Sequence, residues 1–368
     1  MDNPIVIIGA GVSGLRIASL LHSQGIECKV LEARNRVGGR VLSKGIEGRL
    51  DLGKFDLGPT WFWPQREPRI TSLVNELTCK TFDQHLKGAV LFEHNANEPI
   101  QRHMLPEGAV EKSLRLVGGI ETLVEAIAGT LPLDMVELNT QVSAVYQDEN
   151  GCMSVQVEQA EGVQSITLAK LVILAVPPRM IARHIAFTPQ LSSSLMKSLI
   201  EQPTWMAGQA KAIAIYERPF WRDDGLSGQA MSRRGPMQEI HDASPESGSG
   251  ALFGFFGLSA EIRTELGEKK ILELVVDQLT RIYGANAGKP VSLLYKDWSS
   301  DTHTAVIEDS KPLTEFPNYG PIVGSTKTEW GNKIIFAGTE TASHQGGHLE
   351  GALQSAERAV AEVLALLS

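Results

Sequence analysis

Residues 4–15 read Pro4-Ile-Val-Ile-Ile-Gly-Ala-Gly-Val-Ser-Gly-Leu15, and this stretch decides the fold. Ile5 to Ile8 form a short run of β-branched apolar residues, which predicts a buried parallel strand. Gly9, Gly11 and Gly14 follow at G-x-G-x-x-G spacing. In such a turn the first glycine permits the tight bend, the second lets backbone approach a pyrophosphate, and the third lets helix and strand pack closely.

A helix and a second strand complete this pattern. The periodicity of Leu15 to Leu21 predicts a helix, whose N-terminus would aim backbone N–H groups and the positive end of its dipole at phosphates. The strand Cys28 to Leu31 ends at Glu32, a carboxylate placed to accept hydrogen bonds from the ribose hydroxyls of an adenosine. The sequence therefore predicts a dinucleotide site, and a glycine-rich turn without a ligand is the alternative.

The nucleotide-binding pattern continues beyond this carboxylate. Glu32-Ala-Arg-Asn-Arg-Val-Gly-Gly-Arg40 places Ala33, Arg34, Gly39 and Arg40 where a second pass of backbone approaches the phosphates, and the arginines add positive charge there. The E-A-R-x-R-x-G-G-R extension resembles the FAD-binding signature of the flavin-containing amine oxidase family. The resemblance implies that the cofactor is FAD rather than a nicotinamide dinucleotide.

The composition is that of an ordinary globular protein. Of the 368 residues, 42% are hydrophobic and 21% are charged, and the formal net charge is −9, which argues against a nucleic-acid or anionic-membrane surface. No apolar run approaches the roughly 18 residues of a membrane span. Three widely spaced cysteines, Cys28, Cys79 and Cys152, form no metal pattern and suit a reducing compartment. With a first strand at about residue 4, these features predict a soluble, cytoplasmic protein.

The length of the chain exceeds what one hydrophobic core usually supports, so about two domains are expected. The predicted fold class is α/β, with a Rossmann-like (GR2-type) FAD-binding domain interleaved with a smaller α+β substrate domain. By resemblance, the FAD-binding domain takes residues 1–65, 115–200 and 300–368. The substrate domain takes residues 66–114 and 201–299.

One loop resembles the family segment that passes beside the isoalloxazine ring. It reads Phe55-Asp-Leu-Gly-Pro-Thr-Trp61. The resemblance implies that Gly58, Pro59 and Thr60 meet the ring and that Trp61 faces the substrate. A turn with a packing tryptophan is the alternative.

Lys211 interrupts an otherwise apolar strand, Gly208-Gln-Ala-Lys-Ala-Ile-Ala-Ile-Tyr216. The stretch resembles a family segment in which the lysine lies near flavin N5 and holds a water molecule. Burying a lysine costs several kcal/mol unless it is paired or solvated by ordered water. Because strand alternation alone also permits a solvent-facing side chain, that alternative stays open.

Two further cofactor residues rest on the resemblance alone. Val142 matches the strand pair whose backbone clamps the adenine, and Trp298 matches a tryptophan near the flavin. Covalent members of the family carry their flavin-linked cysteine in the stretch that corresponds to residues 299–332. This sequence has no cysteine there, so FAD is expected to bind non-covalently.

The segment from Lys333 to Val360 resembles the closing motif of the family. A helix that begins near His348 and Leu349 would aim its N–H groups at flavin N1/O2, where negative charge develops on reduction. Monoamine oxidases place a tyrosine of the amine-guiding cage where this chain has His348. A neutral imidazole could pack beside an amine, whereas a protonated one would repel it. The residues expected near the phosphates and the ribityl chain are Gly338, Thr339 and Glu340.

The resemblance implies an FAD-dependent oxidoreductase that acts on a small molecule, an amine or an amino acid. Hydride transfer from the carbon next to nitrogen to flavin N5 would give an imine that water hydrolyses, and oxygen would reoxidise the flavin to release peroxide. The candidate catalytic residues are Lys211, Trp61 and His348. Two alternatives stay open: a desaturase or dehydrogenase that acts on a non-amine substrate, and a flavin-binding partner protein with little turnover.

The region that roofs the substrate cavity in larger family members is short here. Fewer than 60 residues separate Trp61 from the glycine pair at Gly118. The site is therefore expected to be more open, or to be covered by a partner subunit. The sequence does not decide the oligomeric state.

Overall fold

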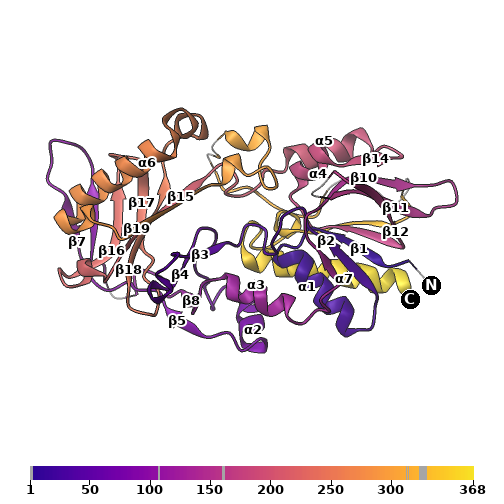
Figure 1. Cartoon of the computed structure of the whole chain (residues 1–368), viewed down its shortest axis with the longest axis horizontal. Helices are drawn as coiled ribbons and strands as arrows, with labels where there is room; N and C mark the ends of the chain where they lie inside the picture. The colour runs from indigo at the N-terminus through magenta and orange to yellow at the C-terminus, as the bar shows by residue number, and fades with distance from the viewer. Residues whose placement is uncertain (1–2, 107, 160–161, 312, 314, 323–329) are drawn as a thin grey trace.

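The computed structural model describes residues 3–106, 108–159, 162–311, 313, 315–322 and 330–368. The molecule is elongated, with a parallel sheet and its helices at one end and a larger mixed sheet at the other (Figure 1). In the described part of the chain, no helix has the length and apolar character needed to cross a membrane.

The parallel sheet runs in the order β20-β13-β1-β2-β9. The central strand β1 lies between β13 and β2, so its carboxyl end opens the crevice in which α/β sheets bind ligands. Its strands are β1 (Ile5–Ile8), β2 (Cys28–Leu31), β9 (Val136–Glu137), β13 (Leu171–Leu174) and β20 (Ile334–Phe336).

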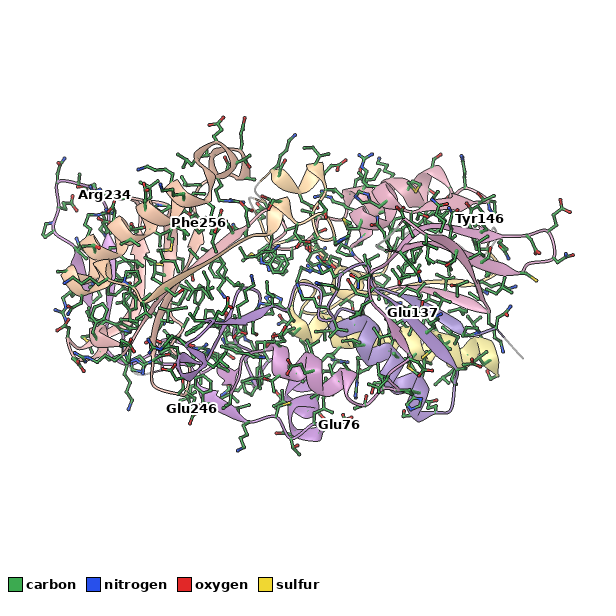
Figure 2. The ribbon with its side chains drawn as sticks, viewed as in Figure 1. Glu76, Glu137, Tyr146, Arg234, Glu246 and Phe256 are labelled. Carbon is green, nitrogen blue, oxygen red and sulfur yellow. The ribbon has the colours of Figure 1, made fainter. Side chains whose placement is uncertain are left out.

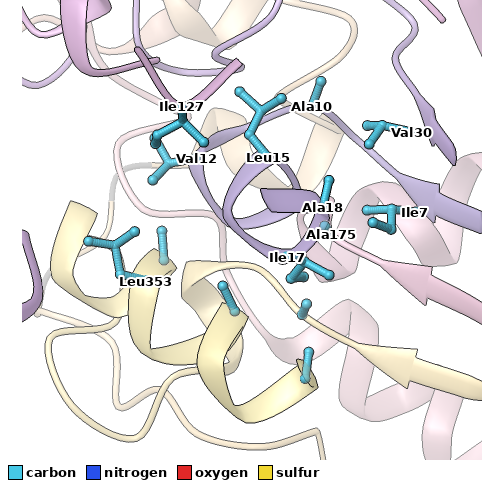
Figure 3. Packing of buried hydrophobic residues seen from close by; sticks show 14 of the residues in the cluster. Ile7, Ala10, Val12, Leu15, Ile17, Ala18, Val30, Ile127, Ala175 and Leu353 are labelled. Atoms are coloured by element: carbon cyan, nitrogen blue, oxygen red, sulfur yellow. The ribbon is translucent and has the colours of Figure 1, made fainter. Parts of the chain in front are cut away.

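Strand β1 divides its side chains between two hydrophobic cores because successive residues of a strand face opposite sides. Ile5 and Ile7 join the core formed with helices α1 (Val12–Ser23), α3 (Glu121–Ala128) and α7 (Leu349–Leu367). Figure 3 shows this packing around α1, with α7 beside it. Val6 and Ile8 join the core on the other side of the sheet.

The second face of the parallel sheet is covered by a smaller sheet and two short helices (Figure 1). This sheet runs in the order β12-β11-β10-β14. Its strands are β10 (Thr140–Gln147), β11 (Met153–Gln159), β12 (Gln164–Ala169) and β14 (Ala186–Thr188), and the helices are α4 (Pro178–His184) and α5 (Ser193–Glu201).

The mixed sheet runs in the order β19-β15-β18-β17-β16-β6-β7. Helix α6 (Ala260–Tyr283) packs on the face that carries Ala212 and Ala214, whereas the face that carries Ile213 and Ile215 packs on residues 52–57. The strands are β6 (Ala89–Glu93), β7 (Gln101–His103), β15 (Ala210–Tyr216), β16 (Leu226–Ser232), β17 (Met237–Asp242), β18 (Gly250–Phe256) and β19 (Ser292–Asp297).

Short elements connect the two ends of the molecule. Helix α2 (Pro68–Glu76) packs on α7, and its buried residues belong to the core around α1. The short strand pairs are β3 (Ser43–Gly45) with β4 (Lys54–Asp56), and β5 (Thr81–Asp83) with β8 (Leu114–Leu116).

The predicted α/β class is confirmed by this architecture. The parallel sheet draws its strands from the segments predicted for FAD binding, and the mixed sheet draws its strands from the segments predicted for the substrate domain; the domain boundaries themselves stay a prediction. One helix begins earlier than its apolar pattern indicates. The sequence predicts a helix over 269–283, but α6 starts at Ala260 because Ser259 caps it, and a kink at Gly267 interrupts the periodicity.

Candidate functional site

A single cavity reaches from the carboxyl end of β1 to the face of strand β15. Its volume is about 360 Å³, within the roughly 300–1,000 Å³ that is usual for small-molecule sites. The lining comes from both ends of the chain and from the middle, including Gly11, Glu32, Lys211 and His348. Residues far apart in sequence therefore form one continuous site.

The glycine turn after β1 has the geometry that a dinucleotide requires. A Cβ at Gly14 would lie 1.9 Å from the carbonyl oxygen of Gly9, so only glycine permits α1 to start this close to the strand. A Cβ at Gly11 would meet no protein atom within 4 Å, because this residue lines the cavity. The space beside Gly11 is what a pyrophosphate would occupy at the N-terminus of α1.

The carboxylate of Glu32 is fixed by backbone groups at the end of β2. Its Oε2 accepts a hydrogen bond from the Ala10 N–H at 2.8 Å, and its Oε1 accepts one from the Arg34 N–H at 2.9 Å. The side chain is buried, with 4% of its surface exposed, yet it lines the cavity. It is therefore held ready to accept hydrogen bonds from a ribose.

The arginines of the extension are paired with carboxylates. Arg34 donates to Asp301 at 2.5 Å and to Thr304 at 2.8 Å. Arg40 forms a two-pronged pair with Glu340, at 2.6 and 3.0 Å, and Glu340 is fully buried. These pairs join the N-terminal motif to the C-terminal half of the chain and offset much of the positive charge predicted there for phosphates.

The residues present fit FAD. The site offers an open glycine turn at a helix N-terminus, a fixed carboxylate at the position of the ribose, and a long cavity beyond them. In the described part of the chain, no group of His, Cys, Asp and Glu side chains is arranged to hold a metal ion.

Lys211 points into the site and not into solvent. Only 2% of the residue is exposed, and its Nζ donates to the Gly58 carbonyl oxygen at 3.0 Å and to the Thr60 Oγ1 at 2.5 Å. Nζ also lies 3.9 Å from the centroid of the Phe253 ring. Burial lowers the pKa of Lys211 to about 7, although the charge of Asp56 opposes this shift.

Aromatic rings continue the wall beyond Lys211. The Trp61 ring lies 5.5 Å from Phe253, 5.2 Å from His241 and 6.3 Å from Trp63, measured between centroids. Trp298, also in the wall, donates its Nε1 hydrogen to the carbonyl oxygen of Leu57 at 3.0 Å and so holds the loop before Gly58. This part of the cavity is apolar and suits the carbon skeleton of a small substrate.

Helix α7 presents its N-terminus to the cavity through His348 and Leu349. The His348 carbonyl oxygen accepts a hydrogen bond from Thr339 at 2.7 Å, and its ring stacks on Phe316 with 5.5 Å between centroids. Burial lowers the pKa of the imidazole, and its Nδ1 is buried with no hydrogen-bond partner in the described structure. The imidazole is therefore neutral at neutral pH, the form compatible with a nearby amine.

Most of the residues predicted for the site line this cavity. Three do not: Gly14 lies behind the turn, Ala33 lies beside Glu32, and the Val142 side chain is buried in the core below β10. The backbone role assigned to Val142 stays a prediction. The predicted residues that line the cavity are Gly9, Gly11, Glu32, Arg34, Gly39, Arg40, Gly58, Pro59, Thr60, Trp61, Lys211, Trp298, Gly338, Thr339, Glu340, His348 and Leu349.

The structure adds lining residues that the sequence analysis missed. Phe253 comes from β18, beside β15, and only strand pairing brings it to Lys211. Trp205 precedes β15 and stacks obliquely on Phe316 at 4.4 Å. Glu67, just before α2, is a buried carboxyl in the same cavity; its only signal in the sequence was an acid ahead of a helical stripe.

Comparison with known proteins identifies one family over most of the chain. The model of the family described as flavin containing amine oxidoreductase matches residues 97–364, and a model described as an NAD(P)-binding Rossmann-like domain matches residues 7–77. A putrescine oxidase of Kocuria rosea is 25% identical, over 99% of this chain and 95% of the relative. A probable flavin-containing monoamine oxidase A of Dictyostelium discoideum is 29% identical, over 98% of this chain and 97% of the relative.

Solved structures agree on the fold. Putrescine oxidase bound to putrescine has a TM-score of 0.78 at 22% identity, covering 99% of each chain. Cyclohexylamine oxidase from Brevibacterium oxydans has a TM-score of 0.79 at 18% identity, covering 100% of each chain. The sequence alignment with the Kocuria enzyme runs over 478 positions although this chain has 368 residues, so at least 110 positions of that relative have no counterpart here.

Proposed function

This chain belongs to the family of flavin-containing amine oxidoreductases, and we propose that it oxidises a small amine or amino acid with FAD held non-covalently. It is an FAD-dependent oxidoreductase of the amine oxidase type. The observation that supports the substrate class is the shape of the cavity, in which the dinucleotide turn opens onto an aromatic chamber beside Lys211. FAD supplies the redox chemistry by accepting a hydride from the carbon next to an amine nitrogen.

The residues of this chain would bind the cofactor and orient it. Glu32 would hold the ribose end of FAD, and the N-terminus of α7 would provide N–H groups and the positive end of a dipole at the opposite end. Trp298 fixes the loop that carries Gly58 through its bond to Leu57. Together these residues would hold the cofactor with its reactive part toward the aromatic chamber.

Lys211 is suited to hold one water molecule. Two of its three Nζ positions are used by Gly58 and Thr60. The third would donate a hydrogen bond to a water below the pKa of about 7 and, as a lone pair, accept a hydrogen bond from it above that pKa. Lys211 can therefore keep a water in place through a change of its own protonation state.

The chamber selects for a neutral amine at the reacting carbon. Trp61 and Phe253 present apolar rings, and the lowered pKa of His348 keeps its imidazole uncharged. A hydride leaves a carbon readily only when the nitrogen beside it has a free electron pair. Apolar rings and a neutral imidazole favour that form of the substrate over the ammonium ion.

Cysteine positions support non-covalent FAD. Cys28 lies in the core under α1, Cys79 follows α2, and Cys152 lies in the turn between β10 and β11. None of the three lines the cavity. We also propose oxygen as the electron acceptor and the cytoplasm as the compartment, the latter because sparse, unpaired cysteines suit a reducing environment.

The test is a panel of primary amines, secondary amines and amino acids offered to the flavin-loaded protein. Anaerobic bleaching of the flavin by at least one amine, with peroxide released when air is admitted, is the expected result. The control is dithionite, which must bleach the flavin regardless of substrate. Flavin that dithionite reduces but that no amine reduces would refute the proposal and favour a non-amine substrate.

A further inference from the structure

Glu67 is a buried carboxyl that faces the substrate cavity. It directly precedes α2, 3% of the residue is exposed, and it lines the same cavity as Lys211 and Trp61. Its Oε2 accepts a hydrogen bond from the Trp63 N–H at 2.7 Å. Its Oε1 makes no hydrogen bond, and the side chain has no ion-pair partner, among the residues that the structure describes.

The carboxylate is not needed to cap its own helix. The first N–H groups of α2, from Arg69 and Ile70, donate to Oε2 of Glu350 on α7 at 2.9 and 3.0 Å. The turn before α2 is closed by the backbone bond from the Glu67 N–H to the Trp63 carbonyl oxygen at 2.9 Å. A neutral glutamine could accept the Trp63 N–H equally well without the cost of burying an acid.

The cations near Glu67 are engaged elsewhere. Arg66 is half exposed, pairs with Glu111 at 2.8 Å and lies over the Trp63 ring at 4.8 Å. Arg69 pairs with Glu350 at 3.1 Å. Since a buried carboxylate is costly without a cation, the free oxygen of Glu67 is suited to a positive charge that arrives with the substrate.

The surrounding rings would also favour a cation. Trp61 and Trp63 line the cavity beside Glu67, with their ring centroids 6.3 Å apart. Indole faces attract ammonium groups within about 6 Å. Because Arg66 already lies over the Trp63 ring, Trp61 is the indole left for an arriving cation, and together with the carboxylate it favours a cationic nitrogen over a hydrocarbon tail.

This subsite cannot serve the nitrogen that is being oxidised. A carboxylate at the reacting nitrogen would hold it as an ammonium ion, which has no electron pair to assist hydride loss. Glu67 also belongs to a different wall of the cavity from Lys211, because it precedes α2, which packs on α7, whereas Lys211 lies on β15 and donates to Gly58 and Thr60. The geometry therefore points to a second nitrogen at the far end of the substrate.

We propose that Glu67 binds the distal ammonium group of a diamine or polyamine and gives this enzyme a preference for such substrates over monoamines of the same length. The inference rests on the proposed amine oxidase function. It concerns binding at the remote end of the substrate and assigns no part of the oxidation to Glu67.

The test compares Glu67→Gln with the wild type on an α,ω-diamine and on the n-alkylamine of equal length. Rapid anaerobic mixing gives a dissociation constant and a limiting rate of flavin bleaching for each substrate. We expect the variant to bind the diamine at least about 30-fold more weakly, the effect of losing one partner of a buried charge pair. The limiting rate, and both constants for the monoamine, should change less than about twofold, as for contacts remote from the reacting atoms.

The matched control is Glu76→Gln. Glu76 is the last residue of α2, at the end opposite Glu67; it is exposed at the outer surface and pairs with Arg16 (Figure 2). This variant removes the same charge and should leave the diamine preference unchanged. Equal visible absorption of the flavin and equal melting temperature in all three proteins would show that each is folded and loaded.

A second measurement uses pH. The pKa of Glu67 is raised to about 7, mainly by burial; the carboxylates of Glu350 and Glu111 contribute to this rise, whereas the Trp63 N–H and Arg66 oppose it. The carboxylate is therefore charged mainly above about pH 7, while alkylammonium groups stay protonated to about pH 10. The ratio of diamine to monoamine affinity should rise between about pH 6 and pH 8.5 in the wild type and stay flat in Glu67→Gln.

The outcomes separate the two proposals. The role of Glu67 would be overturned if Glu67→Gln lowered the affinity for the diamine and for the monoamine equally, or if the wild type bound both with equal affinity. Either result would leave the amine oxidase function in place. A flavin that dithionite bleaches and no amine bleaches would overturn both.

Discussion

Replacing Lys211 by methionine should change how the stability of the protein depends on pH. In the folded state the pKa of Lys211 is about 7, whereas its ordinary value is 10.5. Between these values the unfolded chain carries a proton on this amine and the folded protein does not. Stability from this group therefore rises with pH over that window, and below about pH 7 its contribution is constant and unfavourable.

The magnitude follows from the shift. Each pH unit inside the window is worth at most about 1.4 kcal/mol for one proton, so the wild type should gain about 2.5 kcal/mol relative to Lys211→Met between about pH 7.5 and pH 9.5. The loss of the bonds to Gly58 and Thr60 also affects the variant. That loss changes the free energy of unfolding by the same amount at both pH values. The change with pH therefore reports on the buried amine alone.

The assay is urea unfolding of wild type and variant at both pH values with a fixed excess of FAD. Lys197→Met is the control, because Lys197 is largely exposed and this variant removes the same charge from the surface. A difference between wild type and Lys211→Met that is the same at both pH values would refute the reasoning. It would mean that Lys211 stays charged and solvated in the folded protein.

Three further substitutions test the cofactor site. Gly11→Ala should fold normally, because its Cβ meets no protein atom within 4 Å, yet bind FAD at least about tenfold more weakly in a flavin-fluorescence titration, since the methyl group enters the phosphate space. Glu340→Gln leaves Arg40 without its buried partner and should lower the free energy of unfolding by about 3 kcal/mol in urea; an unchanged value would show that the pair is not important for stability. Trp298→Phe removes the bond to Leu57 and should weaken FAD binding several-fold, about the 1 kcal/mol of one hydrogen bond, with no loss of unfolding cooperativity.

The nucleotide half of the site could be predicted from the sequence because its signals are local. The strand, the glycine turn and Glu32 lie within a stretch of about thirty residues, and each has one plausible task. The pairing of Arg40 with Glu340 could not be read in this way. The two residues are 300 positions apart, and only the folded chain shows that the arginine meets a carboxylate.

The substrate half depends on information that a strand pattern does not contain. The alternation along β15 does not indicate on which face of the sheet Lys211 lies. The packing of Ile213 and Ile215 on residues 52–57 determines this face. Glu67 was missed for a related reason. The apolar stripe of α2 fully explained its segment. No local feature of the sequence indicates that Glu67, just before the helix, is only 3% exposed and faces a cavity.

The two halves of the cavity differ in charge, and the difference changes with pH. Near the reacting end, Lys211 loses its charge as the pH rises, because burial lowers its pKa to about 7. At the far end, Glu67 gains its charge over the same range, because burial raises the pKa of a carboxyl. Above about pH 7 the cavity therefore offers an uncharged chamber at one end and a carboxylate at the other. A substrate with two nitrogens fits both ends of the cavity. Its neutral nitrogen would lie in the uncharged chamber, and its ammonium group would contact the carboxylate.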